Sequence, residues 1–460
     1  MAIIATFVVP HPPLIIPGIG KGEEQHIKKT IAAYKSISKE IALIKPDTII
    51  ISSPHAQVYA DYFHISPGAS AIGNFNQFGA SNVEITVKYD ESLVNVISKE
   101  AKKQNIPAGT QGEINPSLDH GTMVPLYFIN QHYTDYKLVR ISPSGLPSLS
   151  HYKLGKLIQS VIPKEKKVVW ISSGDLSHKL KKDGPYGYIK EGLIFDKKIT
   201  EALAIGDFLK LLTIDSHLVK KAAECGLNSF ILMSGFLDGY NVDAELLSYE
   251  GPFGVGYAIS KYLVLGKDKT RLFLEKYKLQ SIANVKLIRQ NEDPYILLAR
   301  ESLEYYIENR EKMEIPNNVP HEMIDSRAGV FVSIHKDNNL RGCIGTTSPT
   351  THCIAEEIIR NAIKTGTKDP RFTEVKKNEL PYLQYKVDIL YPSEPISSFN
   401  DLDVKKYGVI VSNNYKIGLL LPNLEGIDTV EQQVSIAKKK AGISDDESYK
   451  MERFEVIRHI

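Results

Sequence analysis

The chain has 460 residues, of which 42% are hydrophobic and 24% are charged, which is the composition of an ordinary folded protein and excludes collagen-like and disordered classes. The 56 Lys and Arg and 54 Asp and Glu residues leave a net charge of +2, too small to attract nucleic acid or anionic lipid over the whole molecule. The length is about three times that of a usual domain. We therefore expect at least two domains, with no nucleic-acid partner and no membrane partner.

Neither a membrane anchor nor a disulfide framework is expected. No run of about 18 apolar residues occurs, and the apolar N-terminus lacks the basic segment and small-residue cleavage site of a signal peptide. The cysteines Cys225, Cys343 and Cys353 include no C-x-x-C pair and are odd in number, which suits a reducing compartment. We predict a cytoplasmic protein, and the sequence contains no indication of its oligomeric state.

The first half alternates apolar strands with Lys-rich amphipathic segments. Strands are expected at residues 5–9, 47–53 and 166–173, with helical stretches between them. Near-continuous apolar strands indicate a sheet that is covered on both faces. The sequence thus predicts an α/β domain over residues 1–262, with helices on both faces of its sheet.

The second half lacks a steady strand–helix repeat. A polar linker is expected over residues 263–289, followed by a helix at 294–310 and two strands around the turn Lys336–Asn339. Further strands and helices are mixed in order, which is typical of an α+β domain over residues 290–460. No phosphate-binding glycine motif occurs, so no nucleotide cofactor is expected.

Histidines follow three of the strands predicted for the first half. His11, His55 and His178 each come just after a strand, and the carboxyl ends of parallel strands are where open α/β sheets bind ligands. A fourth, His120, precedes an expected helix, and Glu224 lies in a late helical or loop segment. A histidine beside a strand is usually structural, so only their joint placement predicts a site.

The residue types at these positions match a known metal-binding arrangement. Two imidazoles and one carboxylate on one face of a metal form the facial triad of non-haem Fe(II) oxygenases, and His11, His55 and Glu224 fit it. His178 and His120 would then be available to transfer protons. Tyr59, Phe63 and Tyr249 are candidates for an aromatic lining.

The same residues lie in motifs that carry a family resemblance. The segments VVPHPPL, SSPHAQ, LDHGTMVPL, SSGDLSH and GPFGVGYAIS resemble the LigB-type class III extradiol dioxygenase superfamily, which includes the Memo proteins. The resemblance covers residues 1 to about 262 and implies His11, His55 and Glu224 as metal ligands. It also implies His178 as the acid–base residue and His120 as a second active-site histidine, acting on a catechol-like or other hydroxylated aromatic substrate.

The third ligand has two candidates. Memo proteins have cysteine at the step where the dioxygenases have glutamate, and here Glu224 is followed directly by Cys225. Glu224 is the favoured ligand and implies Fe²⁺. Ligation by Cys225 would instead favour Zn²⁺ or an iron chemistry other than catechol cleavage.

The second half resembles the AMMECR domain family over roughly residues 290–460. The matching motifs are LARESLEYYI, the pentapeptide Arg341–Gly345, the segment DPRF at 369–372 and VDILYPSEPI. Cys343 is either a reactive thiol or, more commonly for such a position, a small buried residue in a tight turn. Asp369 and Arg371 form either an anion clamp or an ion pair that holds a loop.

Three functional hypotheses follow. The first is an Fe²⁺-dependent extradiol-type dioxygenase. The second is a metal-binding protein without oxygenase activity, because LigB-type and AMMECR-type halves on one chain resemble the proteins of AmmeMemoRadiSam systems, which implies a radical SAM enzyme and a Memo-like protein as partners. The third is a non-enzymatic module that binds a peptide or partner protein. The retained set of His11, His55, His120, His178 and Glu224 argues against the third.

Overall fold

The computed structural model describes residues 2–337, 339–424 and 426–460, so Asn338 of the expected turn lies outside the described residues. The chain divides into two units, Met1–Tyr277 and Lys278–Ile460, and helix α10 (Phe273–Arg289) carries the chain from one to the other. Residues 263–289, expected as a linker, comprise the end of β10, a short 3-10 helix and α10.

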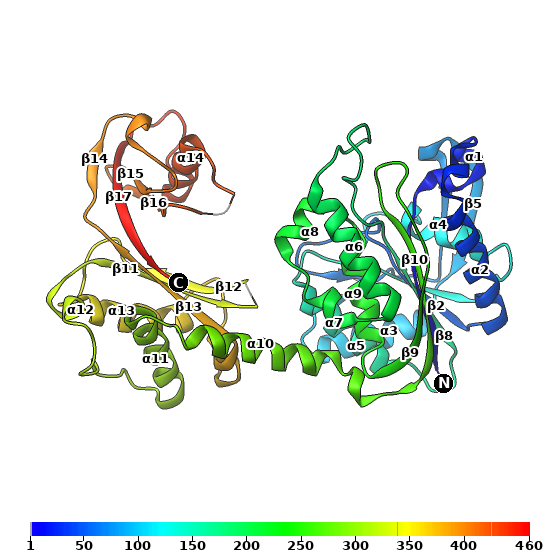
Figure 1. Ribbon diagram of the computed structural model, residues 1–460, viewed down its shortest axis with the longest axis horizontal. Coiled ribbons are helices and arrows are strands. Elements are labelled where there is room, and N and C mark those ends of the chain that lie inside the picture. Colours follow the sequence, from blue (N-terminus) through cyan, green and yellow to red (C-terminus); the bar gives the residue numbers. More distant parts are fainter. Residues whose placement is uncertain (1, 338, 425) are drawn as a thin grey trace. The chain divides into compact units, whose positions relative to one another are not determined.

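The first unit is an α/β domain built on a six-stranded sheet in the order β7-β2-β8-β1-β10-β9 (Figure 1). The first four strands in this order are parallel, and β10 and β9 run antiparallel as a hairpin at one edge. The strands are β1 (Ile3–Val9), β2 (Thr48–Ser52), β7 (Lys137–Ile141), β8 (Val168–Ser173), β9 (Tyr240–Glu250) and β10 (Tyr257–Lys267).

Helices cover both faces of this sheet, as the apolar strands predict. Alternate residues of one strand point to opposite faces, so Ile49 and Ile51 of β2 lie in one core cluster and Ile50 lies in the other. The Ile50 side packs against α3 (Glu91–Lys103), α5 (Ser148–Val161), α6 (Lys190–Ile205), α7 (Phe208–Leu212), α8 (Ser216–Ala222) and α9 (Leu227–Phe236). The other side packs against α2 (Lys28–Ile44) and α4 (His120–Ile129), after the short α1 (Pro17–Gly20).

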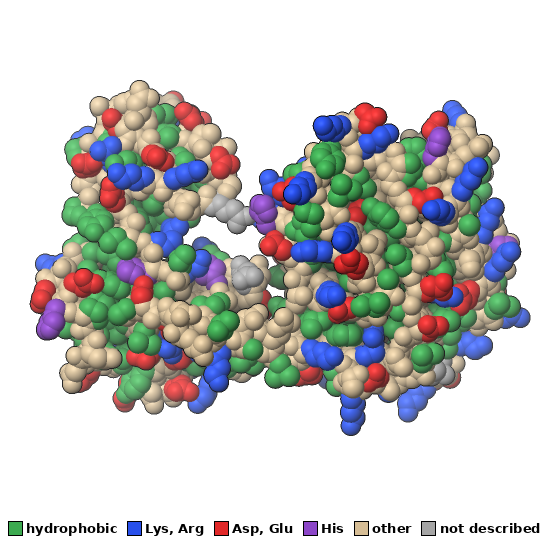
Figure 2. All heavy atoms as spheres, in the orientation of Figure 1, with side chains coloured by type: hydrophobic (Ala, Val, Ile, Leu, Met, Phe, Trp, Pro, Cys, Tyr) green, Lys and Arg blue, Asp and Glu red, His purple; other side chains and the backbone are tan. Residues whose placement is uncertain are grey.

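Two small sheets extend from this core. Strands β4 (Ser70–Phe75) and β5 (Ala80–Lys88) form an antiparallel hairpin whose connection, Asn76–Phe78, is a turn of 3-10 helix. The short strands β3 (Phe63–His64) and β6 (Ala108–Gly109) pair in parallel. Charged side chains of both signs are mixed over the visible face of the unit (Figure 2), in keeping with the net charge of +2.

The second unit is an α+β domain with a wholly antiparallel sheet in the order β12-β11-β13-β17-β15-β16, and β14 also pairs with β17. The strands are β11 (Gly329–Lys336), β12 (Asn339–Gly345), β13 (Leu383–Leu390), β14 (Glu394–Ile396), β15 (Tyr407–Asn413), β16 (Lys416–Leu420) and β17 (Lys450–His459). Its helices are α11 (Pro294–Asn309), α12 (His321–Asp325), α13 (Ile354–Thr367) and α14 (Val430–Ala441).

The sheet of the second unit has two separate cores. Helices α11 and α13 pack with β11 and β13, whereas α14 packs with β15 and β16. The long strand β17 pairs with β13 at one end and with β15 at the other, which joins the two parts (Figure 1). Among the described residues, no helix of either unit has the length and apolarity needed to cross a membrane.

Candidate metal centre

Histidines from three parallel strands meet at one edge of the first unit's sheet. His11 follows β1, His55 follows β2 and His178 follows β8, which lies between β1 and β2 in the sheet. All three strands run in the same direction, so their carboxyl ends share this edge.

Three side chains bring metal-ligating atoms together. The Nε2 atoms of His11 and His55 are 3.0 Å apart, and Cys225 Sγ lies 3.6 Å from His11 Nε2. The ligand atoms of all three residues lie within 4.8 Å of one another. Cys225 reaches this position from the segment between α8 and α9. Two imidazoles and a thiol thus form a set with the size and chemistry of a metal centre.

The hydrogen bonds of His11 leave one ring nitrogen available for a metal. The Ser173 hydroxyl donates to the Gly121 carbonyl (2.6 Å), so it accepts from the Nδ1–H of His11, 2.9 Å away. This bond fixes the tautomer with a lone pair on Nε2, which is the nitrogen that faces His55 and Cys225. Burial, together with neighbouring histidines, holds the pKa of His11 well below its usual range, so the ring is neutral near pH 7.

A buried carboxyl group connects the two sides of this cluster. Asp175 accepts from the backbone N–H of His11 (2.8 Å), and its own N–H is 3.3 Å from Cys225 Sγ. Burial raises the pKa of Asp175 to about 7, and burial also raises the pKa of the Cys225 thiol. A coordinated cation would instead lower the pKa of the Cys225 thiol, because a metal-bound thiol is deprotonated.

Glu224, the favoured third ligand from the sequence, lies outside the converging set. Its carboxyl group accepts from the backbone N–H of Leu227 (2.6 Å) at the start of α9, and burial raises its pKa to about 7. That bond satisfies one of the free amide groups at the beginning of a helix. The structure groups Cys225 with His11 and His55, and ligation by Glu224 stays a prediction.

The two remaining histidines lie beside the cluster. His120 is the first residue of α4, and its ring centroid is 4.2 Å from that of His55 and 5.4 Å from that of His11. Burial, followed by the charge of His55, lowers the pKa of His120 to about 4. Burial and His55 also lower the pKa of His178. Both rings are therefore neutral near pH 7 and able to accept a proton.

Two aromatic residues that the sequence analysis missed contact these histidines. Phe78 packs edge-on against His120 with ring centroids 5.3 Å apart, and Tyr186 stacks on His178 at 5.2 Å. Of the aromatic candidates chosen from sequence, Phe63 is instead in the core against His151, and Tyr249 donates to Asp196. Phe78 lies more than 20 residues from any of these histidines in sequence, and Tyr186 follows His178 by eight residues in an irregular loop. No spacing rule points to either residue.

The pentapeptide Arg341–Gly345 of the second unit is held by an ion pair. Asp369 accepts from the Cys343 backbone N–H (2.9 Å) and binds Arg371 through both carboxylate oxygens, while Arg371 donates to the Cys343 carbonyl (3.2 Å). Asp369 is thus a loop-holding carboxylate. Burial raises the pKa of the Cys343 thiol, which leaves it protonated and weakly nucleophilic near pH 7.

Arg341 of the same pentapeptide is also in a salt bridge. It pairs with Glu379 (3.0 Å), which Lys336 approaches as well at 2.9 Å. Burial alone would raise the pKa of Glu379, but hydrogen bonds from Arg341 and Lys336 lower it to about 2. Arg341 and the backbone of Cys343 therefore both have defined structural roles.

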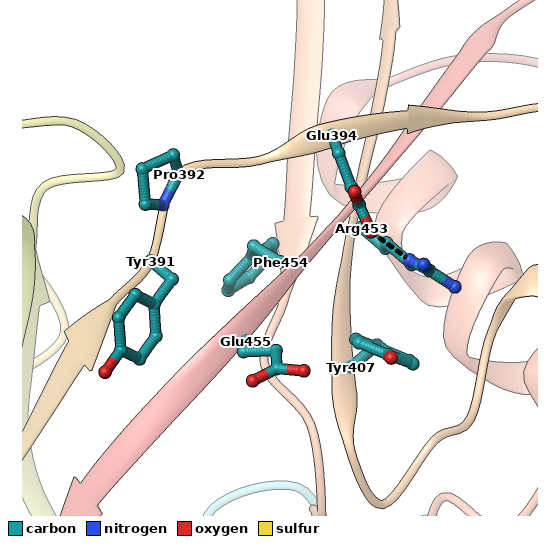
Figure 3. A pocket seen from close by; sticks show the side chains of 7 residues that line it. All are labelled: Tyr391, Pro392, Glu394, Tyr407, Arg453, Phe454 and Glu455. Carbon is teal, nitrogen blue, oxygen red and sulfur yellow. Dashed lines mark hydrogen bonds and ion pairs between the residues drawn. The ribbon is translucent and has the colours of Figure 1, made fainter.

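The second unit also contains a surface pocket of about 290 Å³ beside β17 (Figure 3). Tyr391 and Tyr407 stand on either side of Glu455, and Arg453 pairs with Glu394 at 2.6 Å. Lys406 pairs with Glu455 at 3.1 Å, and both Lys406 and Arg453 lie over the Tyr407 ring. The chain's own cations thus satisfy the charged groups of this pocket.

Comparisons with known proteins match each half of the chain to a protein family. A family model described as the catalytic LigB subunit of aromatic ring-opening dioxygenase matches residues 5–260, and the AMMECR1 model matches residues 296–459. A protein of Clostridium acetobutylicum is 43% identical over 470 aligned positions, which cover 100% of this chain and 99% of that protein. A Thermotoga maritima protein is 48% identical over 170 positions, 36% of this chain and 98% of its own.

Among solved structures, an uncharacterized protein from Pyrococcus horikoshii is 31% identical and covers 36% of this chain and 88% of its own, with a TM-score of 0.34. The two family matches together span most of the chain, and the first alone spans more than half of it. The chain therefore belongs to the family of the catalytic LigB subunit of aromatic ring-opening dioxygenase, and it carries an AMMECR1 domain after the LigB domain.

Proposed function

We propose that the LigB domain is an iron-dependent enzyme that opens the ring of a hydroxylated aromatic compound in an extradiol-type reaction. The observation that carries the proposal is the convergence of four histidines at the carboxyl edge of the sheet, two as candidate ligands and two neutral ones beside them, with a third candidate ligand from the Glu224–Cys225 segment. A purely structural role does not require five such groups at one edge.

The donor set suits a divalent transition metal. His11 and His55 supply neutral imidazole nitrogens, and Cys225 supplies a thiol that becomes a thiolate on binding. Imidazole binds iron and zinc well, and thiolate favours the same two metals over magnesium or calcium. When bound, the metal would supply Lewis-acid polarisation of the substrate's hydroxyl oxygens.

The protein residues around this set perform the proton transfers. Because His178 is neutral near pH 7, it can accept a proton from a substrate hydroxyl and return it later as an acid. His120, held at the start of α4, can hydrogen-bond a substrate oxygen. Ser173 and Asp175 orient His11 and thereby keep the ligand atoms in place.

Oxygen uptake by anaerobically purified, iron-loaded protein tests this proposal. We expect a hydroxylated aromatic from a catechol panel to consume dioxygen and yield a ring-opened product that absorbs in the visible range. The His178→Ala variant should keep its iron and lose turnover. Iron-loaded protein that consumes no dioxygen with any member of the panel would contradict the proposal.

A second function is favoured by Cys225. A thiolate in the ligand set is unlike the carboxylate of the facial triad and suits zinc, or an iron chemistry without ring cleavage. In this case the chain would be a metal-binding component that works with a radical SAM partner, as the pairing of the two domains suggests. Stoichiometric zinc in protein purified without added metal, with no oxygen uptake, would select this function.

A further inference from the structure

His120 and His178, which lie beside the ligand set, are each in contact with an aromatic side chain from a peripheral segment. Phe78 contacts His120, and Tyr186 contacts His178. The two segments are unrelated in sequence and structure: one is the tip of the β4–β5 hairpin, and the other is the loop between Leu180 and Tyr188. Both segments place an aromatic ring against a histidine at the metal centre.

The hairpin fixes Phe78 in place. The 3-10 turn Asn76–Phe78 ends at Gly79, whose φ of 79° lies in the left-handed region that glycine favours. Behind it, the buried ring of Phe75 lies 6.4 Å from that of Phe78. Phe78 itself is 36% exposed, so one part of its ring faces His120 and another part is open.

The loop that carries Tyr186 is closed at its base. Leu180 and Tyr188 form an antiparallel bridge, and the Leu180 N–H donates to the Gly254 carbonyl (3.0 Å). The turn continues through Gly187, with a φ of 76°. Tyr186 is 58% exposed and stacks on His178 with an interplanar angle of 28°.

Phe78 and Tyr186 differ from other exposed apolar side chains in their neighbours. Each is partly exposed and also packs against a histidine beside the metal centre, so each presents aromatic surface next to that histidine. The rings Phe78, His120 and His55 follow one another at centroid separations of 5.3 and 4.2 Å, which extends aromatic surface up to the ligand set.

We propose that Phe78 and Tyr186 are the substrate-binding walls of the metal centre and select a planar aromatic ligand over a non-aromatic one. This inference rests on the proposed function, because it assumes that the ligand binds at the His11, His55 and Cys225 set. Phe78 offers a ring held by the hairpin, and Tyr186 offers a ring held by the closed loop. The contribution of Tyr186 comes from its ring and not from its hydroxyl group.

Anaerobic titration calorimetry of the metal-loaded full chain with two chelating probes tests this inference. Nitrocatechol is aromatic and acetohydroxamate is not, and each binds a metal through two oxygens. We expect Phe78→Ala and Tyr186→Ala each to weaken nitrocatechol binding about five- to tenfold while changing acetohydroxamate binding less than about twofold. Tyr186→Phe should bind both probes like the wild type.

Matched controls come from the same two segments. Ile72 on β4 is 50% exposed and Tyr188 at the loop base is 45% exposed, and Ile72→Ala and Tyr188→Ala should leave both affinities unchanged. Equal weakening of both probes by Phe78→Ala or Tyr186→Ala, or no weakening of either, would overturn the inference while leaving the metal centre intact. Failure of the metal-loaded wild type to bind either probe would instead overturn the proposed function, and this inference with it.

Discussion

The two domains each contain a half-buried free cysteine, and their surroundings differ in what reaches the sulfur atom. Around Cys225, imidazole nitrogen approaches Sγ to 3.6 Å, and a second imidazole lies within ligand distance of the first. Around Cys343, the strong contacts are to the backbone, where Asp369 and Arg371 bind its N–H and carbonyl.

The two thiols have similar exposure and a pKa shifted in the same direction, so these properties do not distinguish them. Burial raises the pKa of both cysteines, so neither is a ready nucleophile near pH 7. Cys225 is distinguished by neighbours that share its capacity to bind a metal, whereas the neighbours of Cys343 fasten a strand to a loop. Substitutions at these residues and their neighbours separate the two roles.

The largest effect should come from a residue that is near the ligand set without belonging to it. His178→Gln removes the proposed proton acceptor, so turnover of an aromatic substrate should fall about a hundredfold or more. Metal content, measured by mass spectrometry, should stay at the wild-type level. Loss of the metal in this variant would place His178 among the ligands and point to a zinc-like site.

Substituting Cys225 and Cys343 one at a time tests whether they differ in metal binding. Cys225→Ala should lower metal content at least about tenfold, because it removes one of three ligands. Cys343→Ala should leave metal content unchanged and serves as the matched control. Glu224→Gln tests the other candidate ligand in the same assay. A loss of metal of about tenfold in Glu224→Gln, together with full metal content in Cys225→Ala, would reverse the assignment.

A smaller effect is expected from the residue that orients His11. Ser173→Ala removes the acceptor of the Nδ1–H, and loss of such a supporting bond weakens metal affinity by about tenfold. Competition with a coloured chelator measures this change. Ser172→Ala, one residue earlier on β8 and bonded to the Ser229 carbonyl, is a control that should keep its metal affinity.

The ion pair that holds Cys343 should contribute to stability and not to metal binding. Asp369 is buried and Arg371 is about half exposed, so Asp369→Asn should cost about 1 kcal/mol of the free energy of unfolding. Thermal unfolding of the full chain, with metal content as a second measurement, checks this. A fall in metal content would show that the two domains do not act separately.

The loss of stability caused by Asp369→Asn should depend on pH. The hydrogen bond from Arg371 holds the pKa of Asp369 below its usual value of 3.8. A carboxyl group whose pKa is depressed by folding stabilises the protein above its unfolded pKa, and that contribution is lost as the pH falls below it. The stability difference between wild type and Asp369→Asn should therefore be full at pH 6 and shrink below pH ~4. A difference that grows on acidification would contradict this account.

Much of the fold could be predicted from sequence because the strands of the first domain are short, apolar and separated by helical segments. The α/β and α+β classes are confirmed. The antiparallel direction of β9 and β10 at the sheet edge, by contrast, could not be predicted, because hydrophobic periodicity indicates that a strand is present but not the direction in which it runs.

The candidate site could be predicted only in part. The rule that ligands bind at the carboxyl ends of parallel strands places His11, His55 and His178 at one edge of the sheet. The choice between Glu224 and Cys225 depends on which side chain turns toward His11, and that is set by the backbone between α8 and α9. Phe78 and Tyr186 come from segments whose tertiary positions no local pattern encodes.

Metal analysis of the anaerobically purified wild-type protein and the His11→Ala variant decides whether this edge of the sheet binds a metal. We expect about one iron or zinc per wild-type chain and at least a tenfold loss in the variant, with unchanged circular dichroism. Iron would direct further work to ring opening, and zinc to the second function. A wild-type chain without metal, or a His11→Ala variant that keeps it, would contradict the assignment of His11, His55 and Cys225 as a metal centre.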